Sequence, residues 1–295
     1  MHNPGAGRQG ADDAKQLQHF LKEHGHEVRY QSTKEEGWKQ ALKKDADLVV
    51  VAAGDGTVGR VTRRMVDRGV PVGLLPSGTA NNIARTLGLV EKPFEELVRG
   101  WENGRRVRLD VGVASGPWGE RYFVEGLGCG VFADLLAGSK GNKKLKKRKD
   151  AVENAMHRLR DIAKRCKPID VVARLDGKDI SGRYLMLEAV NLRYVGPNLH
   201  LAHDSQPGDG QFDVVLVTEE ERDRVVHYLD HWQDNRERIA MLPTLRGKRL
   251  ELEWPGFPLH VDDKLYPRPK AKPSEVAGLV EARLDGDTVE FLLPA

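Results

Sequence analysis

Residues 47–89 read DLVVVAAGDGTVGRVTRRMVDRGVPVGLLPSGTANNIARTLGL, and this stretch decides the fold. It contains two units of the same kind, each an apolar run followed by a turn with glycine and a helix-like segment. The apolar runs cover 48–53 and 70–75. Unbroken apolar runs of this length are typical of strands buried on both faces, as in a parallel sheet covered by helices. The stretch therefore predicts two parallel strands, with helices over 58–68 and 80–87.

The two turns, GDGT at 54–57 and PSGT at 76–79, follow the predicted strands at their carboxyl ends, where open α/β sheets bind ligands. Gly54 and Gly56 let the backbone approach a ligand closely, so that N–H groups can converge on phosphate oxygens. The helix after each turn adds its positive N-terminal end. Asp55 is the exception, because a carboxylate repels phosphate unless it binds a proton, a metal ion or an acceptor hydroxyl. A tight strand–helix turn with an Asp cap is the alternative.

Two motifs in this stretch resemble known families. AGDGT at 53–57 is similar to the GGDGT signature shared by lipid kinases, NAD kinases and, more distantly, phosphofructokinases. PSGTANNIAR at 76–85 is similar to the P-x-GT-x-N-D-x-A-R block of the bacterial diacylglycerol kinase and sphingosine kinase family. NAD kinases lack this second block, so the pair of motifs favours the lipid kinases. The resemblance extends over residues 3–264, with most of its specificity in 53–88.

The resemblance and the sequence pattern together imply two domains, which also suits a length of 295 residues. We expect an α/β nucleotide-binding domain with a parallel sheet over 1–110. A β-rich antiparallel sandwich should follow over 111–295, with the active site in the cleft between the two. The second domain is indicated by four strand-like segments with few helices between them, namely 107–114, 121–126, 169–175 and 184–191.

By the family pattern, the nucleotide site takes residues from the N-terminal NPGAG element and from both turns. These residues are Asn3, Gly7, Thr33, Gly54, Asp55, Gly56, Thr57, Gly78 and Thr79. Thr33 has a second interpretation, because TKEE at 33–36 fits a capping box that opens a helix through Lys44. A short strand is expected just before it, over 27–31. Only Met1 and His2 precede Asn3, whereas the family has several apolar strand residues there, so we expect a trimmed start or a missing strand.

The resemblance also implies a metal site and supporting acids. Asp209 would supply a carboxylate to Mg²⁺, with backbone carbonyls from Gln206 and Gln211, and hard oxygen ligands suit this ion. Asp110, in LDVG, would support the metal site through water. A plain hairpin turn at 206–211 and a strand-end turn at Asp110 are the alternatives.

Several departures from the family pattern surround the expected acceptor site. Gly59 and Arg60 stand where the family has Asn-Glu, and Asn82 replaces an aspartate. Lys264 replaces the glutamate of the D-G-E motif, which is the general base of the family. An ammonium group is a poor base at neutral pH, so Asp262 or Asp263 would have to take that role. The added positive charge would suit an acceptor that already carries an anionic group.

Composition limits the setting of the protein. The chain is 39% hydrophobic and 31% charged with a formal net charge of +3, and its two cysteines favour a reducing cytosol. No apolar run approaches the roughly 18 residues of a membrane span. Seven of the ten residues Lys140–Lys149 are basic. This run is either a solvated surface or a contact with an anionic membrane, whereas nucleic acid is disfavoured because the run lacks aromatic residues.

These features predict an ATP- and Mg²⁺-dependent kinase that phosphorylates a hydroxyl on a lipid or lipid-like acceptor. Asp55, or the pair Asp262 and Asp263, would accept the hydroxyl proton. The protein is expected in the cytoplasm, with peripheral contact to the inner membrane face, and a homodimer is left open. A non-catalytic nucleotide- or lipid-binding protein on the same scaffold is the main alternative, and a NAD kinase is a weaker one. His227 and His231 have a zinc-like spacing, but no third ligand is evident.

Overall fold

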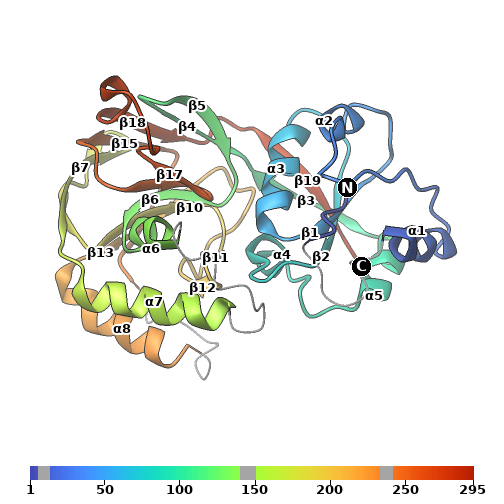
Figure 1. The fold of residues 1–295 in the computed structure, drawn as a ribbon, viewed down its shortest axis with the longest axis horizontal. Helices are drawn as coiled ribbons and strands as arrows, with labels where there is room; N and C mark the ends of the chain where they lie inside the picture. Colours follow the sequence, from blue (N-terminus) through green and yellow to red (C-terminus); the bar gives the residue numbers. More distant parts are fainter. Residues whose placement is uncertain (6–13, 140–150, 233–241) are drawn as a thin grey trace. The chain divides into compact units, whose positions relative to one another are not determined.

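The computed structural model describes residues 1–5, 14–139, 151–232 and 242–295 (Figure 1). The chain forms two compact units, one of Met1–Val111 with Asp287–Ala295 and the other of Gly112–Gly286. The sequence-based division assigned everything after residue 110 to the second domain, whereas the last nine residues lie in the first unit. A strand that returns from the far end of the chain leaves no local signal of its sheet.

The first unit is built on a four-stranded sheet in the order β1-β2-β19-β3. Its strands are β1 (Val49–Ala53), β2 (Val72–Pro76), β3 (Arg105–Asp110) and β19 (Thr288–Leu293). Strands β1 and β2 pair in parallel, and β19 is parallel to β2 and antiparallel to β3. The two strands predicted within 47–89 are therefore confirmed. Their parallel pairing brings the two glycine-bearing turns to the same edge of the sheet.

Five helices are described in the first unit: α1 (Ala14–Glu23), α2 (Trp38–Ala41), α3 (Asp55–Met65), α4 (Asn82–Thr86) and α5 (Phe94–Arg99). Helix α3 buries Val58, Val61 and Met65 at helical spacing, which explains how it packs on the sheet. It begins at Asp55, three residues earlier than predicted. The residues of the first turn motif thus form the first turn of a helix.

Two local predictions in the first unit are wrong. The helix expected from Thr33 is absent, and the short helix α2 begins only at Trp38. The Thr33 hydroxyl does not cap a helix, because it donates a hydrogen bond to the His2 carbonyl at 3.2 Å. Residues 27–31 form no strand, and His2 makes only isolated parallel bridges, to Ala52 and Ser32. Contacts with the start of the chain thus override both local patterns.

The second unit contains two large sheets and a small hairpin of β11 (Tyr194–Val195) and β12 (Leu199–His200). One sheet has the order β14-β13-β10-β6-β16-β17. Its strands are β6 (Gly126–Gly130), β10 (Met186–Val190), β13 (Phe212–Val217), β14 (Thr244–Gly247), β16 (Leu259–Val261) and β17 (Lys264–Tyr266). The other sheet has the order β5-β4-β18-β15-β7-β8, with β9 paired to β7. Its strands are β4 (Gly112–Gly116), β5 (Gly119–Phe123), β7 (Ile169–Leu175), β8 (Lys178–Asp179), β9 (Gly182–Tyr184), β15 (Arg249–Trp254) and β18 (Gly278–Arg283).

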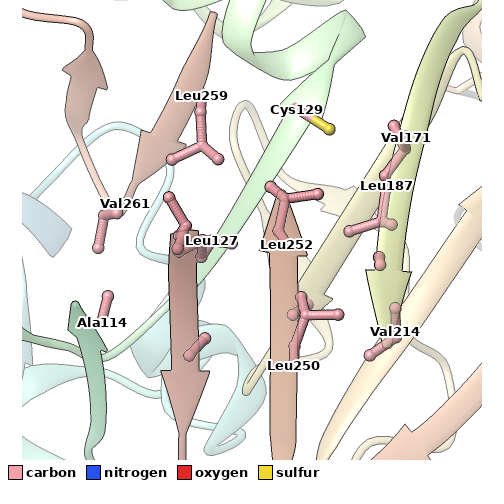
Figure 2. Close-up of a cluster of buried hydrophobic side chains, with 14 of the residues drawn as sticks. Ala114, Leu127, Cys129, Val171, Leu187, Val214, Leu250, Leu252, Leu259 and Val261 are labelled. Atoms are coloured by element: carbon pink, nitrogen blue, oxygen red, sulfur yellow. The ribbon is translucent and has the colours of Figure 1, made fainter. Parts of the chain in front are cut away.

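The two large sheets enclose a common apolar core, so the expected sandwich is present. Figure 2 shows side chains from both sheets in this core, including Leu127 and Leu187 from one and Leu250 and Leu252 from the other. Burial of such side chains is the main stabilising contribution to a fold of this type. The strand predicted over 107–114 is divided, because β3 belongs to the first unit and β4 to the second.

Helices cover the opposite face of the six-stranded sheet. They are α6 (Val131–Ser139), α7 (Ala151–Arg165) and α8 (Arg222–Asp230), and α8 follows a 3-10 turn at Glu219–Glu221. A second 3-10 turn lies at Pro273–Glu275. Residues from these helices and from β10 and β13 form a second apolar cluster. This explains why β10 and β13 are buried along their whole length.

Candidate functional site

The two glycine-bearing turns contact each other directly. A Cβ added to Gly54 would lie 2.8 Å from the Cα of Gly78, and a Cβ added to Gly78 would lie 2.3 Å from the Cα of Gly54. Distances under 3.0 Å are not tolerated by real side chains. Glycine is therefore required at both positions by the contact between the two backbones. This is a second reason for glycine, beside the close approach of a ligand.

Asn81 fixes the second turn. Its backbone is left-handed with φ of 55°. The side chain accepts a hydrogen bond from the Gly78 N–H at 2.8 Å and donates one to the Gly78 carbonyl at 3.0 Å. The side-chain amide of Asn81 thus satisfies both backbone polar groups of Gly78. Asn81 was not among the expected site residues, although its place in the PSGTAN block and the tolerance of Asn for this conformation are visible in the sequence.

The Asp55 carboxylate is directed at the start of helix α4. Its Oδ1 accepts a hydrogen bond from the N–H of Ile83, in the first turn of α4, at 3.1 Å. Burial raises the pKa of the Asp55 carboxyl, and hydrogen bonds from the backbone N–H groups of Ile83 and Asn82 partly offset this effect. The carboxylate therefore links the two strand–turn–helix units. This accounts for an acid in a turn that otherwise suits anions.

The Thr57 hydroxyl links the N-terminal loop to helix α3. Its oxygen accepts hydrogen bonds from the Asn3 side chain at 3.2 Å and from the Arg60 guanidinium at 3.3 Å. The side-chain amide oxygen of Asn3 also accepts a hydrogen bond from the N–H of Gly5. The expected site residues of the first unit, namely Asn3, Gly54, Asp55, Gly56, Thr57 and Gly78, thus lie in one connected group. Thr79 is exposed beside it, and Gly7 lies outside the described residues.

The contact between the turns gives a sharp test. We expect Gly78→Ala to destabilise the protein by about 1–3 kcal/mol and to abolish nucleotide binding, because the methyl group would overlap the backbone of Gly54. Thermal unfolding and ATP titration would measure the two effects. Gly56→Ala in the same motif is the matched control for stability, because no atom lies within 4 Å of its added Cβ. Equal stability losses in the two variants would contradict the direct contact.

Asp262 in the second unit has a structural role. It occupies the turn between β16 and β17 with φ of 49°. Its carboxylate accepts the consecutive N–H groups of Val124, Glu125 and Gly126 at 2.9–3.3 Å. The neighbouring Asp263 is exposed and forms an ion pair with Lys264. Asp262 therefore anchors the turn, whereas Asp263 and Lys264 project from it.

A buried acid–base pair lies beside this turn. Glu188 on β10 and His260 on β16 are both opposite Gly128 of the central strand β6. Because Gly128 has no side chain, the Glu188 carboxylate reaches over it to the His260 Nε2 at 2.9 Å. The His260 Nδ1 lies 3.0 Å from the Asp262 carbonyl. Neither residue was expected in the site, and the pair connects the sheet to the turn.

The predicted metal loop offers oxygen ligands, but its carboxylate is already engaged. Asp209 Oδ1 accepts the Gln211 N–H at 2.9 Å, and Oδ2 binds Arg246. The Gln206 carbonyl accepts the Asp209 N–H at 3.3 Å. Carboxylate and carbonyl oxygens suit Mg²⁺, so the chemistry of the loop fits this ion once Arg246 is displaced. Across the described parts of the chain, no group of three His, Cys, Asp or Glu side chains is arranged to hold a metal.

The remaining expected residues are placed as follows. Asp110 is buried at the end of β3, opposite Thr288 of β19. His227 and His231 lie together at the end of α8, where the His231 ring contacts the His227 carbonyl. Asp55 and Asp110 belong to the first unit, and Asp209 and Asp262 belong to the second. Their convergence stays a prediction.

Comparisons with known proteins agree with the two motifs. Residues 1–114 match the family model of the diacylglycerol kinase catalytic domain. The diacylglycerol kinase of Bacillus subtilis is 28% identical over 61% of this chain and 57% of its own length. That of Mycobacterium tuberculosis is 24% identical over 75% of this chain and 72% of its own. The match with the Bacillus subtilis protein thus spans little more than half of that protein.

The fold is also shared with a solved structure. The crystal structure of a diacylglycerol kinase from Bacillus anthracis superposes with a TM-score of 0.69, at 19% identity, over 97% of this chain and 94% of the other. No helix in the described segments is long and apolar enough to cross a membrane. The domain match over residues 1–114, the relatives and the shared fold make this chain similar to the bacterial diacylglycerol kinases and related lipid kinases, which is the resemblance that the two motifs predict.

Proposed function

We propose that this protein is a kinase that transfers the γ-phosphoryl group of ATP to a hydroxyl on a lipid or lipid-like acceptor. The observation that carries the proposal is the pair of touching glycine turns at the carboxyl ends of β1 and β2, with the Asp55 carboxylate beside them. The related lipid kinases support the reaction class. Phosphoryl transfer depends mainly on positioning and charge stabilisation, which this arrangement can supply.

In the proposed reaction, the acceptor oxygen bonds to the γ-phosphorus while the bond to the bridging oxygen of ADP breaks. The hydroxyl proton passes to a carboxylate. Asp55 is our candidate, because it lies in the first glycine turn and burial raises the pKa of its carboxyl, whereas Asp263 pairs with Lys264. Asp110 would have a supporting role. The N-terminal N–H groups of α3 would face the phosphates.

A magnesium ion would neutralise part of the phosphate charge during transfer. Asp209 and the carbonyls of Gln206 and Gln211 are its proposed ligands. The proposal also includes a peripheral contact with an anionic membrane through Lys140–Lys149, a segment outside the described residues, and cytoplasmic localisation. A homodimer is compatible with the proposal but is not required by it.

The direct test is to incubate the protein with radiolabelled ATP and extracted cell lipids, and separately with NAD, and to identify the labelled product. We expect a labelled lipid phosphate. Nucleotide binding without phosphoryl transfer to any lipid, sugar or NAD would contradict the proposal that the protein is a kinase. It would favour the non-catalytic scaffold, for which Lys264 in place of an acidic residue is the specific argument.

The lysine at position 264 leads to a prediction about the charge of the acceptor. We expect Lys264→Glu to lower transfer to an acceptor with an anionic group by about tenfold or more, because an attraction becomes a repulsion. Labelled products from neutral and anionic lipids would be compared. Lys178→Glu, which makes the same charge change on the exposed strand β8, is the control. Activity on neutral diacylglycerol that arises only in Lys264→Glu would instead identify the natural chain as silenced.

A further inference from the structure

A group of arginines lies beside the first glycine turn. Arg60, Arg63 and Arg64 lie within five residues on α3, the helix that begins at Asp55. Among the described residues, Arg60 and Arg64 form no ion pair with a carboxylate. The charges of Arg63 and Arg60 add to the effect of burial in lowering the pKa of Arg64. Like charges held close together cost free energy, and a bound anion would recover this cost.

Trp38 holds two of these cations. Trp38 is only 9% exposed, and the Arg64 and Arg60 guanidinium carbons lie 4.8 Å and 5.3 Å from the centre of its ring. A guanidinium packed on an indole face is stabilised and has less conformational freedom than one in solvent. The short helix α2 therefore provides a platform for the arginine side chains of α3.

Arg60 differs from Arg64 in where its donors point. The Arg64 guanidinium donates to the Arg60 carbonyl within its own helix at 2.9 Å. The Arg60 guanidinium instead donates to the Thr57 hydroxyl oxygen at 3.3 Å, in the first turn of α3. Asn3 reaches the same oxygen from the N-terminal loop. Arg60 thus extends along the helix to the glycine turn, with donors left over for a ligand, since a guanidinium has five.

A second cation lies near the N-terminal loop. The Lys34 ammonium group is 2.4 Å from the position that a Cβ on Gly5 would take, so it lies against the backbone of this loop. Arg60 and Lys34 therefore flank the group formed by Asn3, Gly5 and Thr57. Fork-shaped guanidinium donors and a lysine point charge are the usual partners of phosphate oxygens.

We propose that Arg60, oriented by Trp38 and Thr57 and assisted by Lys34, is a phosphate-binding element of this chain beside its first glycine turn. The element rests on the proposed function, because that turn is the proposed nucleotide site. It explains why an arginine at position 60 is compatible with the site: the residue adds positive charge where phosphate is expected. The phosphate belongs either to the nucleotide or to a phosphorylated acceptor.

The test compares Arg60→Gln with Arg99→Gln in the full chain. The Arg99→Gln substitution removes an equal charge from the same unit, but Arg99 forms an exposed ion pair with Glu95 within α5. Binding of tripolyphosphate, ATP, adenosine and glycerol phosphate would be measured by calorimetry at two salt concentrations. We expect Arg60→Gln to lower the affinity for tripolyphosphate and for ATP by about tenfold or more, because a charge-assisted hydrogen bond is lost. The affinity for adenosine should stay within twofold. Arg60→Lys should recover part of the affinity, and Arg99→Gln should change none.

The outcomes separate the two sources of phosphate. Weaker binding of glycerol phosphate alone would support the element as part of the acceptor site, and weaker tripolyphosphate binding would support it as part of the nucleotide site. Unchanged affinity for every anion in Arg60→Gln would overturn the inference, even if the natural chain phosphorylates lipids. Arg60-dependent anion binding without any phosphoryl transfer would retain the inference and reject the proposed function.

Discussion

Asp55→Asn should preserve the fold and lower phosphoryl transfer to the lipid acceptor by at least about 10²-fold, the low end for loss of a positioned proton-transfer group. The amide oxygen of Asn can still accept the Ile83 N–H that Asp55 now receives at 3.1 Å. The link between the first turn and α4 would therefore remain, while the negative charge and the proton acceptor are lost. Thermal unfolding and single-turnover transfer from labelled ATP would measure the two properties.

The pH dependence of the same variant adds a second readout. Because burial raises the pKa of Asp55, the proposed transfer activity of the unaltered chain should be lost on acidification at a pH above the ordinary aspartate pKa of about 4. This acid limb should be missing from the residual activity of Asp55→Asn. Asp55→Ala is the control for structure, because it also removes the hydrogen bond to Ile83 and should lower stability by about 1 kcal/mol. Full activity in Asp55→Asn would show that the carboxylate only braces the turns.

The first unit shows how far local sequence can predict a fold. The strands within 47–89 and the turns after them could be predicted because an apolar run, a glycine turn and a helix follow one another without a break. The pairing of β1 with β2 then brings the turns together. The contact between Gly54 and Gly78 could not be predicted, since glycine in such a turn is equally explained by a ligand.

Other features depend on pairing between distant segments. The capping box at Thr33 is a valid local signal, but the hydroxyl binds the His2 carbonyl, which lies 31 residues earlier. Strand β19 joins the first sheet although the whole second unit lies between β3 and β19 in the sequence. The row of Glu188, Gly128 and His260 requires the register of three strands. None of these three long-range contacts can be predicted from a short stretch of sequence.

The Glu188–His260 pair gives the largest expected effect on stability. We expect Glu188→Ala to lower the free energy of unfolding by about 3 kcal/mol or more, because it leaves the buried His260 ring without its partner. Glu188→Gln should cost less, since the amide keeps the shape and can hydrogen-bond to the Nε2 atom. Asp170→Asn is the control, because Asp170 pairs with Arg183 on an exposed surface and should cost no more than about 1 kcal/mol. Urea unfolding would measure all three variants.

The pair also predicts how stability changes with pH. Burial raises the pKa of Glu188, with partial compensation by His260. Burial opposes charging of His260, but the Glu188 carboxylate and the Asp262 carbonyl outweigh this and raise the pKa of the imidazole. A raised folded-state pKa contributes stability that is complete below the unfolded value and is lost as pH rises through the folded value. The advantage of the natural chain over Glu188→Ala should therefore decline as pH rises, first above about 4.3 for Glu188 and then above about 6.5 for His260. An advantage that instead grows over this range would show that the buried pair does not retain its proton.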